Sequence, residues 1–187
     1  MKFSLSREAF LKPLQFVVGV VERRQTLPIL SNVLLSLENG RLSMTGTDLE
    51  VEIVGFSDSG PDGEDGEVTV SARKLVDICR SLPDGAQINF SSGEGKATLK
   101  SGRSKFTLAT LPANEFPSVD EGEKTIEFVV KGSVLKGLIE ATSFAMAQQD
   151  VRYYLNGMLW ELTNNNLRTV ATDGHRMALC DGACDVS

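Results

Sequence analysis

Three stretches of the chain share one pattern, in which alternating apolar residues are followed by apolar residues at helical spacing. They are residues 3–12 (FSLSREAFLK), 68–77 (VTVSARKLVD) and 128–141 (FVVKGSVLKGLIEA). A period of two is typical of a strand, and a spacing of three to four is typical of a helix. Ser6 and Ser71 stand where strand gives way to helix, and serine is a favoured N-cap residue. The sequence therefore predicts three strand-then-helix units.

Each predicted helix carries an apolar stripe suited to packing against a sheet. The stripes are Phe10, Leu11, Leu14, Val17 and Val18; Leu75, Ile78, Cys79 and Leu82; and Leu135, Leu138, Ile139 and Thr142. Pro13 lies within the first stripe, and an interior proline removes one helical hydrogen bond. We expect that helix to begin late or to bend.

Turn residues predict antiparallel strands between the helices. Residues 32–46 predict a hairpin around Asn39-Gly40, a dipeptide that favours two-residue turns. Residues 158–172 predict a second hairpin that turns at Asn164–Asn166, since asparagine tolerates positive φ. Residues 88–111 predict three short strands. Helices combined with antiparallel strands indicate an α+β protein.

The chain matches itself without a gap at an offset of 125 residues. The matched pairs are Phe3/Phe128, Leu30/Leu155, Leu34/Leu159, Leu37/Leu162, Asn39/Asn164, Leu42/Leu167, Thr47/Thr172 and Asp48/Asp173. Residues 57–67 predict an acidic loop, and residues 111–125, with two prolines and a charge cluster, predict a connector. We therefore expect one domain at 1–120 and the truncated first half of a second at 121–187, within a longer protein.

The charge balance limits how the protein could bind nucleic acid. Lys and Arg number 19 against 25 Asp and Glu, which gives a formal net charge of −6. This balance argues against a globally basic surface but allows a locally basic face. No apolar run approaches the roughly 20 residues of a membrane helix, and the N-terminus MKFSLSREAF is too polar for a signal peptide. We expect a cytoplasmic protein with reduced cysteines.

Candidate catalytic and metal-binding residues are few. Asp173 and His175 could form the general-base pair of a hydrolase, but their repeat partners are Asp48 and Glu50, so the pair is not shared. We expect Asp48 and Asp173 instead to hold turns through side-chain to backbone bonds. A single histidine and a C-x₃-C pair fall short of the four ligands that zinc prefers. We expect no enzyme activity, no metal and no cofactor.

Six long segments between residues 27 and 179 carry a family resemblance that covers essentially the whole chain. They are LPILSNVLL (27–35), TGTDLEVE (45–52), SARKLVDICRSLP (71–83), SGRSKFTLATLPANEFP (101–117), ATSFAMAQQDVRYYLNGMLWE (141–161) and LRTVATDGHRMAL (167–179). These segments resemble the bacterial DNA polymerase III sliding clamp, or beta subunit. The resemblance implies the DNA-clamp fold, a ring of two subunits with three similar domains each. Helices would line the DNA side and antiparallel sheets would lie outside; the third domain would be absent here.

The resemblance also implies residues that contact DNA. These are Arg24, Arg73, Gln149, Tyr153 and Tyr154. Arg80 stands seven residues after Arg73 and hence on the same side of the predicted helix, where both would meet phosphates without reading sequence. The alternative for the arginines is a solvated helix face, and the alternative for the tyrosines is a partly buried aromatic pair.

Two further surfaces are implied by the resemblance. One wall of a pocket for short hydrophobic peptides would comprise Leu155, Thr172, Gly174, His175, Arg176 and Met177. A subunit interface would comprise Lys74, Arg103, Lys105, Phe106 and Leu108. Strand alternation separates Phe106 and Leu108 from the two cations. These two apolar residues could equally face their own core.

The function implied by the resemblance is that of a sliding clamp, a processivity factor of DNA replication. A full-length homodimeric ring would encircle duplex DNA and tether the DNA polymerase III catalytic subunit, the clamp loader, other polymerases and repair proteins. A ring holds DNA by topology, so weak phosphate contacts suffice and permit sliding. The alternatives are a protein-interaction module without a DNA role, and a hydrolase that uses Asp173 and His175.

Overall fold

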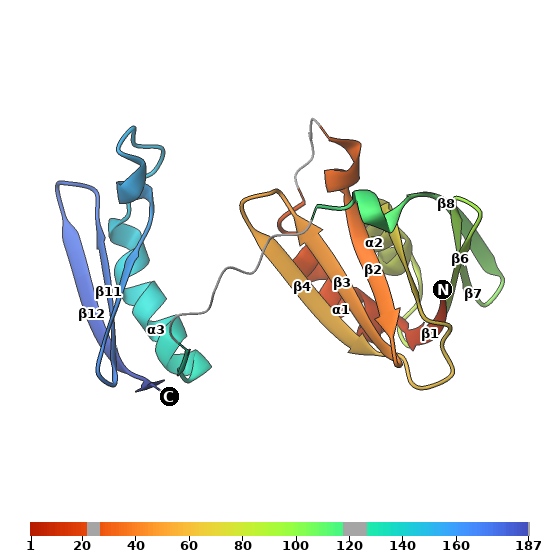
Figure 1. The fold of residues 1–187 in the computed structure, drawn as a ribbon, viewed down its shortest axis with the longest axis horizontal. Helices are drawn as coiled ribbons and strands as arrows, with labels where there is room; N and C mark the ends of the chain where they lie inside the picture. Colours follow the sequence, from red (N-terminus) through yellow and green to blue (C-terminus); the bar gives the residue numbers. More distant parts are fainter. Residues whose placement is uncertain (22–26, 118–126, 187) are drawn as a thin grey trace. The chain divides into compact units, whose positions relative to one another are not determined.

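The chain forms two compact units, Met1–Asp120 and Glu121–Ser187. The computed structural model describes residues 1–21, 27–117 and 127–186 (Figure 1). No helix in those ranges combines the length and the apolar character needed to cross a membrane. Both units combine helices with antiparallel strands, which confirms the predicted α+β class.

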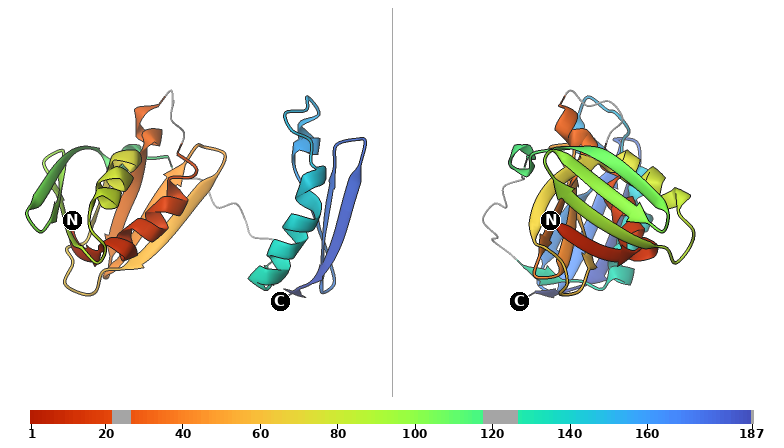
Figure 2. Two further views of the ribbon diagram at one scale, coloured as in Figure 1. Left: turned by 180° about the vertical axis from the view of Figure 1, so that it is seen from behind. Right: turned by 90° about the vertical axis from the view of Figure 1, so that its right-hand side faces the viewer.

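The first unit is one antiparallel sheet with two α-helices against it. Its elements are β1 (Lys2–Ser6), α1 (Arg7–Val17), η1 (Pro28–Ser31), β2 (Asn32–Glu38), β3 (Arg41–Thr47), β4 (Glu52–Asp58), β5 (Gly66–Ser71), α2 (Ala72–Ser81), β6 (Gln87–Gly93), β7 (Lys96–Ser101), β8 (Ser104–Leu111) and η2 (Ala113–Glu115). The strand order is β1-β6-β7-β8-β5-β2-β3-β4. Helices α1 and α2 contact each other, and Figure 2 shows them side by side within the curve of the sheet.

The second unit repeats part of this plan. Its elements are β9 (Phe128–Val129), α3 (Gly132–Thr142), η3 (Ser143–Ala145), η4 (Tyr153–Asn156), β10 (Leu159–Thr163), β11 (Asn166–Thr172), β12 (Met177–Ala183) and β13 (Asp185–Val186). Strands β10, β11 and β12 form an antiparallel sheet, and β9 pairs with β13. Helix α3 packs across β11 and β12. Leu138, Leu167 and Cys184 form the small core between helix and sheet.

The predicted helices are present, with differences at their first residues. Helix α1 begins at Arg7, because the Ser6 hydroxyl accepts a hydrogen bond from the Ala9 amide at 3.3 Å. The expectation of a late start is therefore wrong, and Pro13 lies inside the helix. Ser71 occupies the N-cap position of α2, but its side chain makes no capping hydrogen bond.

The apolar stripes form the core of the first unit. Buried side chains of α1 and α2 include Phe10, Leu14, Leu75 and Cys79. The ring of Phe3 stacks on Phe90 with centroids 4.9 Å apart and lies 5.7 Å from the ring of Phe10. Aromatic contacts at these distances add to the free energy gained from burial. The helices are thus fixed against the sheet by the residues that the spacing identified.

The hairpins also follow the turn chemistry. Asn39 and Gly40 both have positive φ, 50° and 78°, as a two-residue turn of the primed type requires. Asn166 already begins β11, so the second hairpin turns at 164–165 and is shorter than predicted. The three strands expected over 88–111 are β6, β7 and β8. The acidic loop is also shorter than predicted, because β4 continues to Asp58 and β5 begins at Gly66.

Candidate functional site

A Thr-Asp turn connects β11 to β12 in the second unit. The carboxylate Oδ1 of Asp173 accepts hydrogen bonds from the backbone amides of His175 and Arg176, both at 2.9 Å. The hydroxyl of Thr172 accepts from the Gly174 amide at 3.1 Å and donates to the Arg176 carbonyl at 2.7 Å. The backbone bonds from Arg176 and His175 lower the pKa of Asp173. The carboxylate therefore meets His175 at its amide rather than at its imidazole.

The same turn connects β3 to β4 in the first unit. Asp48 Oδ1 accepts from the amides of Val51 at 2.7 Å and Glu50 at 2.9 Å. Thr47 Oγ1 accepts from the Leu49 amide at 3.0 Å. These bonds confirm the prediction that both aspartates hold turns, and the bonds from Val51 and then Glu50 lower the pKa of Asp48. Leu49 has φ of 80° where the second unit has Gly174 at 89°.

The loop from α3 to β10 is organised by one carboxylate. Asp150 Oδ1 accepts from the Arg152 backbone amide at 2.8 Å and from Nε at 3.0 Å, and Oδ2 accepts from Nη2 at 2.9 Å. Asn156 closes the loop by accepting from the Asp150 amide and donating to its carbonyl, both at 3.0 Å. The sequence analysis did not predict this network of Asp150, Arg152 and Asn156. A signal was available, because aspartate favours turns in which its side chain accepts a hydrogen bond from the backbone amide two residues later.

The loop displays the predicted aromatic pair. Tyr153 and Tyr154 are both largely exposed, with ring centroids 6.0 Å apart in an edge-to-face arrangement. The alternative of a partly buried aromatic pair is therefore wrong. Gln149 is exposed and has φ of 57°. Arg24, its repeat partner, lies outside the described residues.

The Asp150–Arg152 pair gives a titration prediction. The side-chain bonds from Arg152, followed by its backbone bond, lower the pKa of Asp150 from 3.8 to about 2. A lowered folded-state pKa means that the bonds stabilise the fold above about pH 4, and that this contribution is lost as the pH falls through about 2. A carboxyl NMR titration should place the Asp150 midpoint near 2, and Arg152→Gln should raise it.

The matched control for that titration is Arg168→Gln. Arg168 Nε donates to Asp181 at 2.8 Å, and its side-chain bonds lower the pKa of Asp181. This control variant should raise the Asp181 midpoint and leave that of Asp150 in place. An Asp150 midpoint at the ordinary value in the unmodified chain would contradict the loop geometry.

The predicted peptide-pocket residues gather at one end of the second unit. Thr172, Gly174, His175, Arg176 and Met177 form the turn and the start of β12, and the last four are exposed. The Arg176 guanidinium lies 5.7 Å from the centroid of the Phe144 ring. The Arg152 guanidinium approaches Gly174. The structure thus brings five of the six predicted residues together in the turn, and Arg152 connects that turn to the loop that carries the sixth, buried Leu155.

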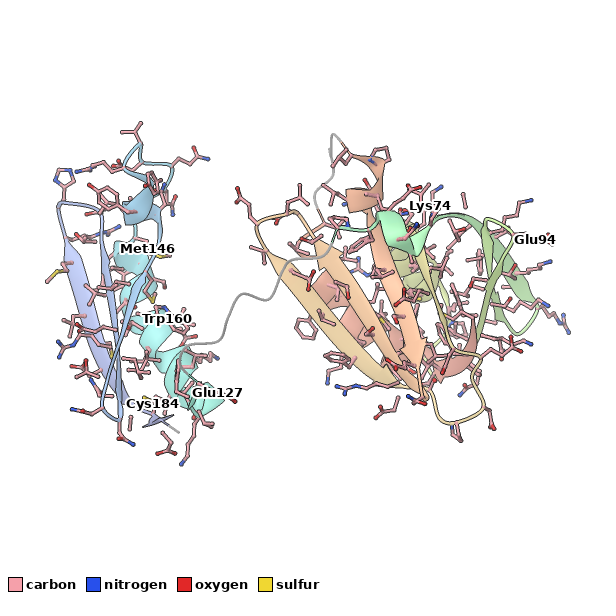
Figure 3. The ribbon with its side chains drawn as sticks, in the orientation of Figure 1. Lys74, Glu94, Glu127, Met146, Trp160 and Cys184 are labelled. Atoms are coloured by element: carbon pink, nitrogen blue, oxygen red, sulfur yellow. The ribbon has the colours of Figure 1, made fainter. Side chains whose placement is uncertain are left out.

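The predicted cations of the first unit that fall within the described residues lie on its surface. Arg73, Arg80 and Lys74 (labelled in Figure 3) are exposed on α2. Arg103 is exposed in the turn before β8, and Lys105 is exposed on β8. An open groove is lined by Ser81, Leu82, Pro83, Ala86, Gln87, Asn89, Ser101, Gly102, Arg103, Ser104 and Phe106.

The two apolar rim residues are oriented toward their own unit. Leu108 is buried in the core of the first unit, and half-buried Phe106 packs against that core. The core interpretation is confirmed for Leu108, whose side chain is unavailable to a partner. Phe106 also lines the groove beside Arg103, so it retains one accessible edge.

Comparisons with known proteins agree across both units. The sequence model of the DNA polymerase III beta subunit N-terminal domain matches residues 1–120, and that of its central domain matches 129–187. The beta sliding clamps of Pseudomonas putida and Escherichia coli K12 are 62% and 53% identical over 180 residues. Each match covers 96% of this chain and 49% of the relative, so the chain spans about half the length of the curated relatives it matches.

Solved structures give the same result. A DnaN sliding clamp from Pseudomonas aeruginosa bound to griselimycin is 58% identical with a TM-score of 0.95, covering 100% of this chain and 50% of that one. The Caulobacter crescentus pol III beta structure is 42% identical with a TM-score of 0.90, covering 99% and 51%. The chain belongs to the DNA polymerase III beta subunit family, the bacterial beta sliding clamps.

Proposed function

We propose that the chain is part of a sliding clamp that encircles duplex DNA and tethers a DNA polymerase to it. The observation that carries this proposal is the match of both units, in order, to the N-terminal and central domains of the beta subunit. In this role the chain performs no catalysis. It supplies a surface that slides along DNA and a surface that holds partners.

The DNA-facing surface would combine cations with flat side chains. Exposed Arg73 and Arg80 would meet phosphates from helix α2, with Arg24 as a further contact. Gln149 and the exposed Tyr153–Tyr154 pair would contact DNA from the loop between α3 and β10. Aromatic faces can stack there on bases or sugars. The net charge of −6 suits a ring whose outer surface repels DNA.

The partner-facing surface would be the cluster of Leu155, Thr172, Gly174, His175, Arg176 and Met177. Polymerases, the clamp loader and repair proteins would insert short hydrophobic peptides there. Met177 is exposed, and a methionine surface adapts to several partners. Lys74, Arg103, Lys105 and the open edge of Phe106 would contribute to the subunit interface of the homodimeric ring.

The test of the clamp function is topological. A full-length protein that contains this chain is loaded by its clamp loader onto a nicked circular DNA, and retention is followed by gel filtration. The protein should stay with the circle and leave when the DNA is linearised, because only a free end allows a closed ring to escape. Equal retention on linear and circular DNA would overturn the proposal.

The arginine pair on α2 gives a second measurement. The logarithm of the DNA-binding constant falls linearly with the logarithm of the salt concentration, and each phosphate contact steepens that slope by about 0.9. If both cations meet phosphates, Arg73→Ala/Arg80→Ala in the full-length protein should therefore reduce the magnitude of that slope by about 2. Lys96→Ala/Lys100→Ala, which removes two exposed cations of β7, is the control and should leave the slope unchanged. Identical slopes for both variants would remove α2 from the DNA-facing surface.

A further inference from the structure

Three candidate DNA-facing residues of the second unit flank one ion pair in the loop from α3 to β10. Gln149 directly precedes Asp150, the acid of the pair. Tyr153 and Tyr154 directly follow Arg152, the base of the pair. The two side-chain bonds from Arg152 to Asp150, at 3.0 and 2.9 Å, fix the loop between these contacts. The position of the tyrosine pair therefore depends on how the Arg152 side chain is held.

The Arg152 guanidinium also lies against the turn between β11 and β12. A Cβ placed on Gly174 would be 3.4 Å from Nη1 and 3.5 Å from Nη2 of Arg152. The hydrogen bonds to Asp150 raise the pKa of Arg152, and the charge of Asp173 in the turn adds to this effect. Figures 1 and 2 show the loop and the turn at the same end of the second unit. One side chain thus contacts both segments.

Arg152 also fixes Leu155, the candidate peptide-pocket residue on the loop. The Leu155 amide donates to the Arg152 carbonyl at 2.9 Å, and the Leu155 carbonyl accepts from the Ala147 amide at 2.9 Å. Three further candidate pocket residues follow Gly174 directly in the chain. The main chain of Arg152 is therefore bonded to one candidate pocket residue, and its side chain lies against another.

The first unit shows that the turn itself does not require a glycine. Leu49 is the counterpart of Gly174 at the offset of 125, and the two residues have φ of 80° and 89°. Both turns keep the same aspartate bonds to backbone amides. What the missing side chain of Gly174 provides is space for the guanidinium. Leu27 stands where the second unit has Arg152, so the first unit has no guanidinium at this place.

We propose that Arg152 is a positioning residue that couples the DNA-facing loop to the partner-facing turn, so that DNA bound at the tyrosine pair strengthens peptide binding at the turn. This inference rests on the proposed clamp function and concerns its regulation. A ligand that holds the tyrosine pair also holds Arg152, and through it Gly174. The turn then needs less ordering when a peptide arrives. By linkage, a bound peptide strengthens the DNA contact by the same factor.

The experiment measures peptide affinity on and off DNA with a full-length protein that contains this chain. The probe is a fluorescein-labelled peptide with the clamp-binding segment of the cognate polymerase, and its binding is followed by fluorescence anisotropy. The protein is measured free in solution and after loading onto a nicked circular DNA. The dissociation constant should be at least about fivefold lower on DNA. Arg152→Gln should remove that difference.

The matched control is Arg168→Gln. Arg168 makes the same kind of two-bond pair with Asp181, between β11 and β12 and outside the loop. This variant should leave the ratio of the two dissociation constants unchanged. If Arg152 served stability alone, Arg152→Gln would weaken peptide binding equally on and off DNA and keep the ratio, which would overturn the proposal.

The outcomes separate the coupling from the clamp function on which it rests. Equal peptide affinities on and off DNA in the unmodified protein would overturn the coupling alone, because retention on the nicked circle tests the clamp function separately. The absence of peptide binding in both states would overturn the partner-facing surface and the coupling with it.

Two substitutions at Gly174 test the contact without changing any charge. Gly174→Ala and Gly174→Leu both place a Cβ at positive φ, so they share the backbone strain. A Cβ at 3.4 Å is at ordinary contact distance, whereas the outer carbons of leucine would compete with the guanidinium of Arg152 for space. Gly174→Leu should therefore reduce the ratio of the two dissociation constants more than Gly174→Ala. Equal ratios would contradict the proposed contact.

The contact can also be measured in the 187-residue chain, even where a full-length variant fails to load onto DNA. His175 is the single histidine, so its imidazole signals are readily assigned by NMR. Arg152→Gln should shift the signals of His175 and of the Met177 methyl group, because the guanidinium leaves the turn. Arg168→Gln should leave them in place. Unchanged signals in Arg152→Gln would overturn the contact and the coupling that depends on it.

Discussion

Phe10→Ala is expected to lower the free energy of unfolding of the first unit by about 3–5 kcal/mol. Phe10 is 0% exposed and stands on the face of α1 that meets the sheet, with its ring 5.7 Å from that of Phe3. Removing the ring loses its transfer free energy and leaves a cavity between helix and sheet. The surrounding strands cannot close that cavity, because their hydrogen-bonded ladders fix their positions.

Phe16→Ala is the matched control for this substitution. Phe16 belongs to the same helix but is 66% exposed, so its replacement should change stability by no more than about 0.5 kcal/mol. Urea unfolding followed by far-ultraviolet circular dichroism gives both values, since the single tryptophan lies in the second unit. Equal losses for the two variants would mean that the burial of α1 contributes little to stability.

Features that depend on short-range chemistry could be predicted from the sequence. The Asn39-Gly40 turn and the two aspartate turns require only nearby backbone groups, so their residue types identify them. The helix stripes were also predictable, because spacing alone decides which side of a helix is apolar. The two copies of the repeat also share hydrogen bonds: Asp48 and Asp173, which are 125 residues apart, each accept a bond from the backbone amide two residues later.

Features that depend on tertiary contacts could not be predicted in the same way. Ser71 has the residue type of an N-cap but makes no capping bond, because residue type does not fix the side-chain geometry. Alternation placed Phe106 and Leu108 on one side of β8 without deciding whether that side meets the core or a partner. The Asp150–Arg152–Asn156 network joins residues across a loop, and periodicity carries no information about loops.

The candidate DNA-facing residues were likewise predictable only in part. The sequence places Arg73 and Arg80 on one side of a helix, and the structure shows that this side is exposed. Exposure makes a phosphate contact possible but does not distinguish it from a solvated helix face. In the proposed clamp, the salt dependence of DNA binding by the full-length protein is the measurement that separates these two roles.

Helix α1 approaches β3 closely at Gly46, so a larger side chain there is expected to destabilise the first unit. A Cβ at Gly46 would lie 2.7 Å from Val17 Cγ1 and 3.0 Å from the Val17 carbonyl oxygen. Val17 is fully buried, its branched side chain has little rotamer freedom, and its carbonyl belongs to the helix backbone. Gly46→Val should therefore push α1 away from the sheet and cost about 1–3 kcal/mol, the usual range for an overpacked core.

Gly93→Val separates this steric effect from the general effect of valine in a strand. Gly93 ends strand β6, is exposed, and has no heavy atom within 4 Å of the position a Cβ would take. Valine favours extended backbone, so this variant should be neutral or slightly stabilising. The urea concentration at the unfolding midpoint should be lower for Gly46→Val than for Gly93→Val. Equal midpoints would mean that α1 can shift freely on the sheet, and the rigid placement of the helix against β3 would then have to be abandoned.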